Sequence, residues 1–181
     1  MTLKRYRGGF TLIEMLTTVA LLIIGLGLMV SLARYVRSRS AEELTRRILV
    51  NLHAAMLEYS RQVGSNGKPW GPPAIESFID NKPTDEVALL SAATANNKKV
   101  VLFFKSHKDL AAKALRDLPY DDGTVRDAWG TPIVFMPAMH RQIGMAPGNE
   151  WFFFSAGADR QYLTRDDNQY SYEALGAGES K

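Results

Sequence analysis

The order of apolar and polar positions divides the chain into two unlike parts. From Phe10 to Ala33 nearly every position is apolar, and Glu14 carries the only formal charge. A run of about 20 such residues is long enough to cross the hydrocarbon of a bilayer as a helix. From Arg34 onward apolar positions recur every three or four residues. This spacing predicts an amphipathic helix that continues to about Val63.

The second helical segment carries one apolar stripe. Its members are Leu44, Ile48, Leu52, Met56, Tyr59 and Val63. No Pro or Gly interrupts residues 28–63, so we expect the two segments to form one rod whose second half packs on a domain. Turn-forming residues at 64–69 end this rod.

The stretch that follows the rod predicts short elements of both kinds. Ile75–Ile79 and Val87–Ala95 each follow a proline and are expected to be short helices. Val100–Phe104 is rich in β-branched and aromatic residues, which is typical of a strand. Ser106 and Asp109 have a spacing like that of a capping box and predict the start of another helix, with Leu110, Ala114 and Leu118 on one face.

Two apolar runs near the C-terminal end predict a small sheet. Gly130-Thr131-Pro132 favours a turn before the strand Ile133–Phe135, since proline is tolerated at a strand's first position. Trp151–Ser155 is the second strand, and the two are expected to pair antiparallel against the rod. The predicted fold class is therefore α+β: a long N-terminal α-helix on a small globular domain with short helices and a small antiparallel sheet.

Charge and composition narrow the class of partner. Residues 1–47 contain eight Lys and Arg against three Glu, whereas residues 48–181 contain fourteen against sixteen acids. The positive charge therefore flanks the apolar segment, and the domain itself is slightly acidic. A nucleic-acid-binding domain has the opposite distribution, so we expect no nucleic-acid partner.

The sequence offers little for catalysis, and we predict that the protein is not an enzyme. The chain has no Cys, which excludes a cysteine nucleophile and a thiolate metal site. His53, His107 and His140 are widely spaced and share no motif. Trp70 and Trp129, beside Gly and Pro, admit two interpretations: a ligand surface, or core side chains that anchor loops.

The N-terminus carries a specific motif. A basic head (Lys4, Arg5, Arg7) precedes Gly8, and Gly9-Phe10-Thr11-Leu12-Ile13-Glu14 opens the apolar helix. This pattern resembles the prepilin signal of type IV pilins and of the pseudopilins of type II secretion. An ordinary secretory signal cleaved after Ser31-Leu32-Ala33 is the alternative, but it does not account for Glu14 within the apolar run.

The resemblance implies a processing pathway. A prepilin peptidase is expected to cut after Gly9, and the new amine of Phe10 is expected to be methylated. The resulting division is a leader at 1–9, a membrane and filament-core helix at 10–33, an amphipathic helix at 34–63 and a periplasmic globular domain at 64–181.

The same resemblance implies that Glu14 helps dock the subunit into a filament. Physical chemistry supplies a reason, because the free amine of one copy can neutralise the carboxylate of the next, and an unpaired charge in an apolar setting costs several kcal/mol. Glu14 also lies where the helix dipole favours an anion. A glutamate that merely lies among lipid headgroups is the alternative.

Asp127-Ala128-Trp129-Gly130-Thr131-Pro132 followed by an apolar strand resembles an element of the major pseudopilin of type II secretion. Together with the prepilin signal, this resemblance implies an inner-membrane protein with a cytoplasmic N-terminus and a periplasmic domain that assembles into a periplasmic filament. Expected partners are further copies, minor pseudopilins, the prepilin peptidase and methyltransferase, and the inner-membrane assembly platform. A minor type IV pilus or DNA-uptake pilin, and an uncleaved membrane-anchored periplasmic binding domain, are the alternatives.

Ser155-Ala156-Gly157-Ala158-Asp159, a loop, and Asp166-Asp167 resemble the C-terminal calcium loop of the same family. The resemblance implies that Asp159, Asp166 and Asp167 are the side-chain ligands of one Ca²⁺, with a carbonyl such as that of Ala156. Calcium prefers six to eight oxygen ligands, which carboxylates and carbonyls supply. Arg160 and Arg165 offer the alternative of a salt-bridged loop without metal.

Overall fold

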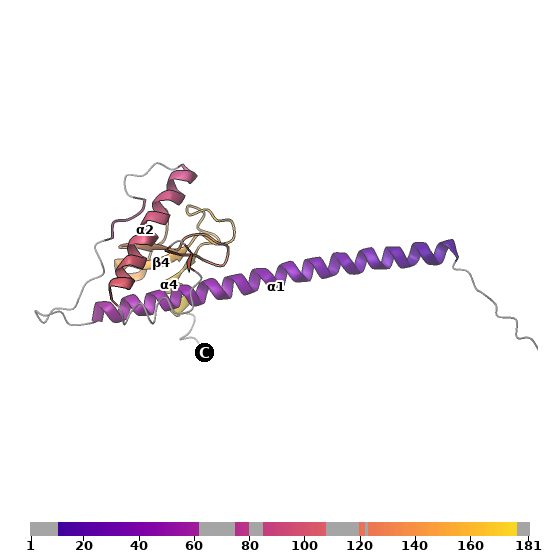
Figure 1. The fold of residues 1–181 in the computed structure, drawn as a ribbon, viewed down its shortest axis with the longest axis horizontal. Coiled ribbons are helices and arrows are strands. Elements are labelled where there is room, and N and C mark those ends of the chain that lie inside the picture. The colour runs from indigo at the N-terminus through magenta and orange to yellow at the C-terminus, as the bar shows by residue number, and fades with distance from the viewer. Residues whose placement is uncertain (1–10, 62–74, 80–84, 108–119, 122, 177–181) are drawn as a thin grey trace, which may run out of the picture. The chain divides into compact units, whose positions relative to one another are not determined.

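A computed structural model describes residues 11–61, 75–79, 85–107, 120–121 and 123–176 (Figure 1). The chain forms two compact units, residues 1–39 and residues 40–181, and each is considered by itself. The described part has the α+β composition predicted from the sequence, an arrangement typical of pilins.

The first element is a single long helix, α1 (Leu12–Arg61). It runs through Gly25 and Gly27 without a break, and a Cβ added at either glycine would meet none of the described residues outside the helix's own backbone within 4 Å. The prediction of one uninterrupted rod is therefore confirmed for residues 12–61, whereas Val63 lies outside the described residues. In the first unit the side chains of α1 are exposed almost throughout, Leu12 by 84% and Met29 by 71%.

Within the second unit α1 buries one face. The buried residues are Thr45, Ile48, Leu49, Leu52, His53, Ala55 and Met56. Ile48, Leu52 and Met56 of the predicted stripe are buried and Tyr59 packs partly buried against the same core, but Leu44 is 45% exposed and does not belong to the stripe. Thr45 occupies that end of the stripe, because its hydroxyl accepts a hydrogen bond from the backbone N–H of Ala128 at 3.1 Å.

The predicted antiparallel pair is present and has a third strand. β3 (Val134–Met136) pairs with β4 (Phe152–Ser155), and β4 pairs with β5 (Gln169–Tyr170), both antiparallel, in the order β3-β4-β5. Phe135 lies opposite Phe153. The strands begin one residue later than the sequence pattern predicted, which is within the usual uncertainty of strand boundaries.

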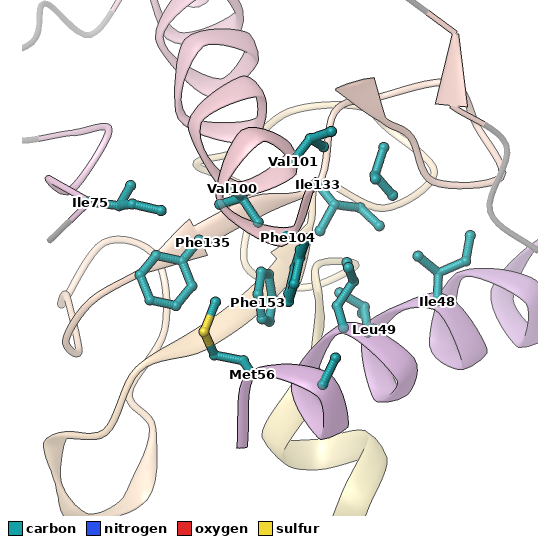
Figure 2. Close-up of a cluster of buried hydrophobic side chains, with 13 residues drawn as sticks. Ile48, Leu49, Met56, Ile75, Val100, Val101, Phe104, Ile133, Phe135 and Phe153 are labelled. Carbon is teal, nitrogen blue, oxygen red and sulfur yellow. The ribbon is translucent and has the colours of Figure 1, made fainter. Parts of the chain in front are cut away.

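Both faces of this sheet are covered, so β4 is a continuous apolar run instead of an alternating one. Side chains alternate between the faces. Phe135 and Phe153 point to the face that α1 covers, among Ile48, Leu49, Met56 and Phe104 (Figure 2). Phe152 and Phe154 pack on the other face in a second cluster, together with Val134, Met136, Ile143, Tyr162 and Tyr170.

The sequence prediction is wrong for Val100–Phe104. These residues are not a strand but the last part of a second helix, α2 (Glu86–Ser106), which also contains the predicted helical segment Val87–Ala95. Leu89, Ala93, Val100 and Phe104 are buried at helical spacing, so packing outweighs the β-propensity of the short apolar run. Ile75–Ile79 is not helical.

The predicted helix start at Ser106 is also wrong. Ser106 is the last residue of α2, and its hydroxyl donates to the carbonyl of Phe103 at 2.7 Å. Asp109, Leu110, Ala114 and Leu118 lie outside the described residues.

The remaining elements are short. β1 (Tyr120–Asp121) and β2 (Thr124–Val125) form an antiparallel hairpin. A 3₁₀ turn, η1 (Pro147–Asn149), precedes β4. The helix α4 (Ser171–Gly176) directly follows β5.

Two adjacent asparagines fasten α2 to the sheet. Asn96 accepts a hydrogen bond from the N–H of Phe135 at 2.9 Å and donates to the carbonyl of the same residue at 3.0 Å. Asn97 accepts from the N–H of Val125 at 2.8 Å, and its amide also donates to the carbonyls of Val125 and Ile133. Both side chains are buried and behave as peptide groups of an additional strand.

We predict that Asn97→Ala lowers the free energy of unfolding by about 3 kcal/mol, because it leaves buried backbone groups of Val125 and Ile133 without partners. Ser91→Ala, an exposed position on the same helix, is the matched control and should change stability by less than about 0.5 kcal/mol. Denaturant unfolding of the detergent-solubilised chain, followed by tryptophan fluorescence, measures both. Equal losses in the two variants would contradict this role of Asn97.

Candidate functional site

The N-terminus of α1 is closed by a reciprocal pair of hydrogen bonds. The hydroxyl of Thr11 accepts the N–H of Glu14 at 3.3 Å, and a carboxylate oxygen of Glu14 accepts the N–H of Thr11 at 3.4 Å. This is a capping box, in which Thr11 is the N-cap residue and Glu14 is the third helical residue.

The capping box gives Glu14 a role within its own chain. Both bonds are long and solvent-exposed, so they hold the carboxylate at the helix end without burying it. The carboxylate thus remains accessible to a cation from another molecule. Gly9 and Phe10, the predicted cleavage and methylation positions, lie outside the described residues.

The segment from Asp127 to Pro132 forms a turn around one buried carboxylate. Oδ1 of Asp127 accepts the N–H of Trp129 at 2.9 Å and of Thr131 at 2.8 Å. The backbone N–H of Asp127 donates to the carbonyl of Thr131, and Gly130 has a φ of +87°, which favours glycine. Trp129 is half-buried. The aspartate therefore shapes the turn that precedes β3.

The same carboxylate reaches the strand β4. Oδ2 of Asp127 accepts the hydroxyl of Ser155 at 2.6 Å, and the hydroxyl oxygen of Ser155 accepts the N–H of Gly157 at 3.1 Å. Burial raises the pKa of Asp127, and its hydrogen bonds partly oppose that rise. The two segments singled out in the sequence, 127–132 and 155–159, are thus joined through one side chain.

His53 of α1 meets the C-terminal helix α4 in the interior. Its Nδ1 lies 2.9 Å from the hydroxyl oxygen of Ser171, which accepts the N–H of Phe153 at 3.0 Å. The ring of Trp151 lies 4.5 Å away, measured between ring centroids. Either group can donate in the hydrogen bond between Ser171 and His53, because a hydroxyl both donates and accepts and the role of Nδ1 depends on the imidazole tautomer.

This serine–histidine pair serves structure. Ser171 is fully buried, so its oxygen is closed to a substrate. Burial lowers the pKa of His53, and the negative charge of Glu150 partly opposes this. The pair therefore fastens α4 and β4 to α1.

The predicted calcium loop is ordered around Asp167. Oδ2 of Asp167 accepts the N–H of Asp159 at 2.8 Å, and Oδ1 of Asp159 accepts the N–H of Gln161 at 2.8 Å. Gly157 has a φ of +69°, and a Cβ there would lie 2.2 Å from the carbonyl oxygen of Asp167. The loop closes tightly only because residue 157 is glycine.

The loop offers buried oxygens that suit a cation, but its acidic side chains are not arranged around one point. Oδ1 of Asp167 and Oδ1 of Asn168 are buried without a hydrogen-bond partner, and such oxygens are suited to a hard cation. However, no group of three or more Asp, Glu, His or Cys is arranged to hold a metal in the described part of the chain, so the three aspartates do not converge there.

The salt bridges of the alternative interpretation are not present in the described part of this loop. Among the described residues 157–168, no ion pair joins Arg160 or Arg165 to Asp159, Asp166 or Asp167. Arg160 has a left-handed φ of 63°. Burial raises the pKa of Glu173, and the positive charge of Arg165 partly opposes that rise.

Several residues that stabilise the helix end, the sheet contacts and the turn were not predicted from the sequence. The role of Thr11 could have been predicted, since a threonine three residues before a glutamate at a helix start is typical of a capping box. No local sequence pattern could have predicted the roles of Asn96, Asn97 and Ser171, because their partners are backbone groups that lie far away in the sequence.

The comparisons with known proteins bear on the N-terminal region. Residues 4–32 match the family model of the prokaryotic N-terminal methylation motif. A search of curated proteins and a search of solved structures each return no match. α1 is long and apolar enough to cross a membrane by length and composition. Together these findings support a type IV pilin-like, membrane-anchored subunit that a prepilin peptidase processes.

We predict that stability falls as the pH drops below 6.5, in part because of His53. Its folded-state pKa lies below the ordinary value of 6.5, so its contribution is complete above that pH and is lost as the pH falls through the folded-state pKa. Denaturant unfolding at pH 7.5 and pH 5.5 measures the change. His53→Asn should reduce the difference between the two pH values, whereas the control His140→Asn should preserve it. An unchanged difference in His53→Asn would exclude His53 as its source.

Proposed function

We propose that the chain is a structural subunit of a type II secretion pseudopilus. A prepilin peptidase would remove residues 1–9, and the subunit would then leave the inner membrane for a short periplasmic filament. The observation that carries the proposal is the methylation motif at 4–32 joined to a helix whose apolar half is exposed and whose other half is built into a domain. The turn at 127–132 favours the secretion class over pilins in general.

The domain would face the periplasm and the leader the cytoplasm. Its partners would be further copies of the chain, minor pseudopilins, the processing enzymes and the inner-membrane assembly platform. In this role the protein turns over no substrate and binds no nucleic acid. Affinity would come from packing of the exposed apolar half of α1, for which Leu16, Ile23 and Leu28 are available.

Glu14 would change partner on assembly. Within the described residues of the single chain, its carboxylate accepts a long, exposed bond from the N–H of Thr11. In the filament the methylated amine of Phe10 from a neighbouring copy would replace that bond with a charged one. Charge-assisted hydrogen bonds are shorter and about twice as strong as neutral ones, which favours the exchange.

We predict that Gly9→Ala blocks loss of the leader, because a Cβ at the cleavage position hinders the peptidase. Glu14→Gln should still be cleaved but should assemble at least tenfold less, since the amine loses its counter-charge. Co-expression with the peptidase, N-terminal sequencing and quantification of sedimented filaments measure these outcomes.

Thr11→Ala is the matched control for Glu14. It removes the hydroxyl that caps α1 but keeps the carboxylate. If Glu14 acts in docking, Thr11→Ala assembles nearly as well as the unmodified chain. Equal assembly defects in Thr11→Ala and Glu14→Gln would reduce Glu14 to a capping residue. An uncleaved chain would favour a membrane-anchored binding domain, and filaments on the cell surface would favour a pilus or DNA-uptake pilin.

We also propose that the loop 157–168 binds one Ca²⁺, with Asp159, Asp166 and Asp167 as the acidic residues that would hold it. The support is the buried Oδ1 of Asp167, which has no partner of its own. A bound cation would supply charge neutralisation and would stabilise the turn around Gly157. Convergence of all three carboxylates would require the loop to rearrange.

We predict that calorimetry of the detergent-solubilised chain detects Ca²⁺ binding at or below millimolar concentration. Asp167→Asn should weaken Ca²⁺ binding at least tenfold, because the change removes the negative charge of the carboxylate that carries the buried Oδ1. Asp85→Asn, an acid that precedes α2, is the control and should bind normally. Absence of heat at several millimolar calcium would remove the metal from this loop.

A further inference from the structure

Arginines crowd the point at which the apolar part of α1 ends. Residues 12–33 are apolar apart from Glu14 and a few hydroxyl side chains, and Arg34, Arg37 and Arg39 follow at once. All three arginines are exposed. The sequence contains no acid between Glu14 and Glu42, so this segment carries a local excess of positive charge.

The axial position of these arginines matches a membrane surface. At 1.5 Å per residue, residues 12–33 extend about 33 Å, which is close to the roughly 30 Å of a bilayer's hydrocarbon core. From Arg34 to Arg39 the helix rises about 7.5 Å. The headgroup layer on each side of the bilayer is about 5–7.5 Å thick, which is comparable to this rise, so one such layer can hold all three guanidinium groups.

The angular position of the arginines favours lipid over a protein neighbour. Successive residues of a helix are rotated by about 100°. Arg34 and Arg37 are therefore about 60° apart, and Arg39 projects toward the other side of the helix. Headgroups surround a membrane helix on all sides, whereas a second protein chain contacts one face of it.

Tyr35 lies within the same layer and supports this placement. Its ring is 58% exposed, and the guanidinium carbon of Arg39 lies 5.5 Å from the ring centroid. Tyrosine is enriched at the boundary between hydrocarbon and headgroups, and a cation over its ring gains further stabilisation.

We propose that Arg34, Arg37 and Arg39, the arginine collar of α1, bind the phosphate groups of anionic phospholipids in the leaflet nearest the domain. Guanidinium groups bind phosphate through two parallel hydrogen bonds, which suits this ligand. The collar fixes the depth of α1 in the bilayer and must release its lipids when the subunit leaves the membrane. The inference rests on membrane insertion of α1 and is independent of the kind of filament formed.

The test uses the full chain in mild detergent and native mass spectrometry, with phosphatidylglycerol and phosphatidylcholine of identical acyl chains as probes. All variants carry K4Q, R5Q and R7Q, so that the leader's cations do not contribute. We expect phosphatidylglycerol to bind about tenfold more tightly than phosphatidylcholine, and R34Q/R37Q/R39Q to reduce this preference to less than twofold.

R46Q/R47Q, which removes two arginines farther along the same helix, is the control and should retain the preference. Equal binding of the two lipids by the parent chain overturns the proposal. An undiminished preference in R34Q/R37Q/R39Q also overturns it. So does a variant that loses self-association while its lipid preference stays intact, since the collar would then contact a second copy. Leader cleavage and filament yield are measured separately, so failure here leaves the proposed function standing.

Discussion

Everything in the second unit depends on covering both faces of a sheet that has only three short strands. Phe153 points to one face, and Phe152 and Phe154 point to the other. A small sheet owes its stability in water to a buried apolar face or to packing against a helix. α1 covers the first face with Ile48, Leu49 and Met56, so the segment after the apolar run cannot leave the domain without exposing its core.

The sequence predicted the parts of this arrangement that are encoded locally. The apolar period of residues 34–63 identified the helix, and the run at Trp151–Ser155 identified the central strand. Val100–Phe104 was assigned to the wrong class, because a run of five apolar residues has the same local pattern in a buried strand and in a buried helix. Only the partners of Leu89, Ala93 and Phe104 decide between the two.

The candidate sites divide in the same way. Glu14 and Asp127 could be singled out because each lies in a short sequence motif, and within the chain each makes local hydrogen bonds, one at a helix end and the other in a turn. Ser171 could not be singled out, since its value lies in contacts with His53 and Phe153, which are distant in sequence. The convergence of the three aspartates was likewise inferred from sequence order, which does not specify how a loop folds.

The hydrogen bonds of Asn96 and Asn97 in α2 affect which edge of the sheet is open to strand pairing between copies of this protein. β3 is an outer strand, and an outer strand with free N–H and C=O groups invites pairing with a strand of another molecule. Here the outward groups of Phe135 are bound by Asn96, the carbonyl of Ile133 by Asn97, and the N–H of Ile133 by the carbonyl of Val125. The side chains of α2 thus make the hydrogen bonds that a neighbouring strand would otherwise make. The β3 edge of the sheet is therefore closed to pairing with a strand of another molecule.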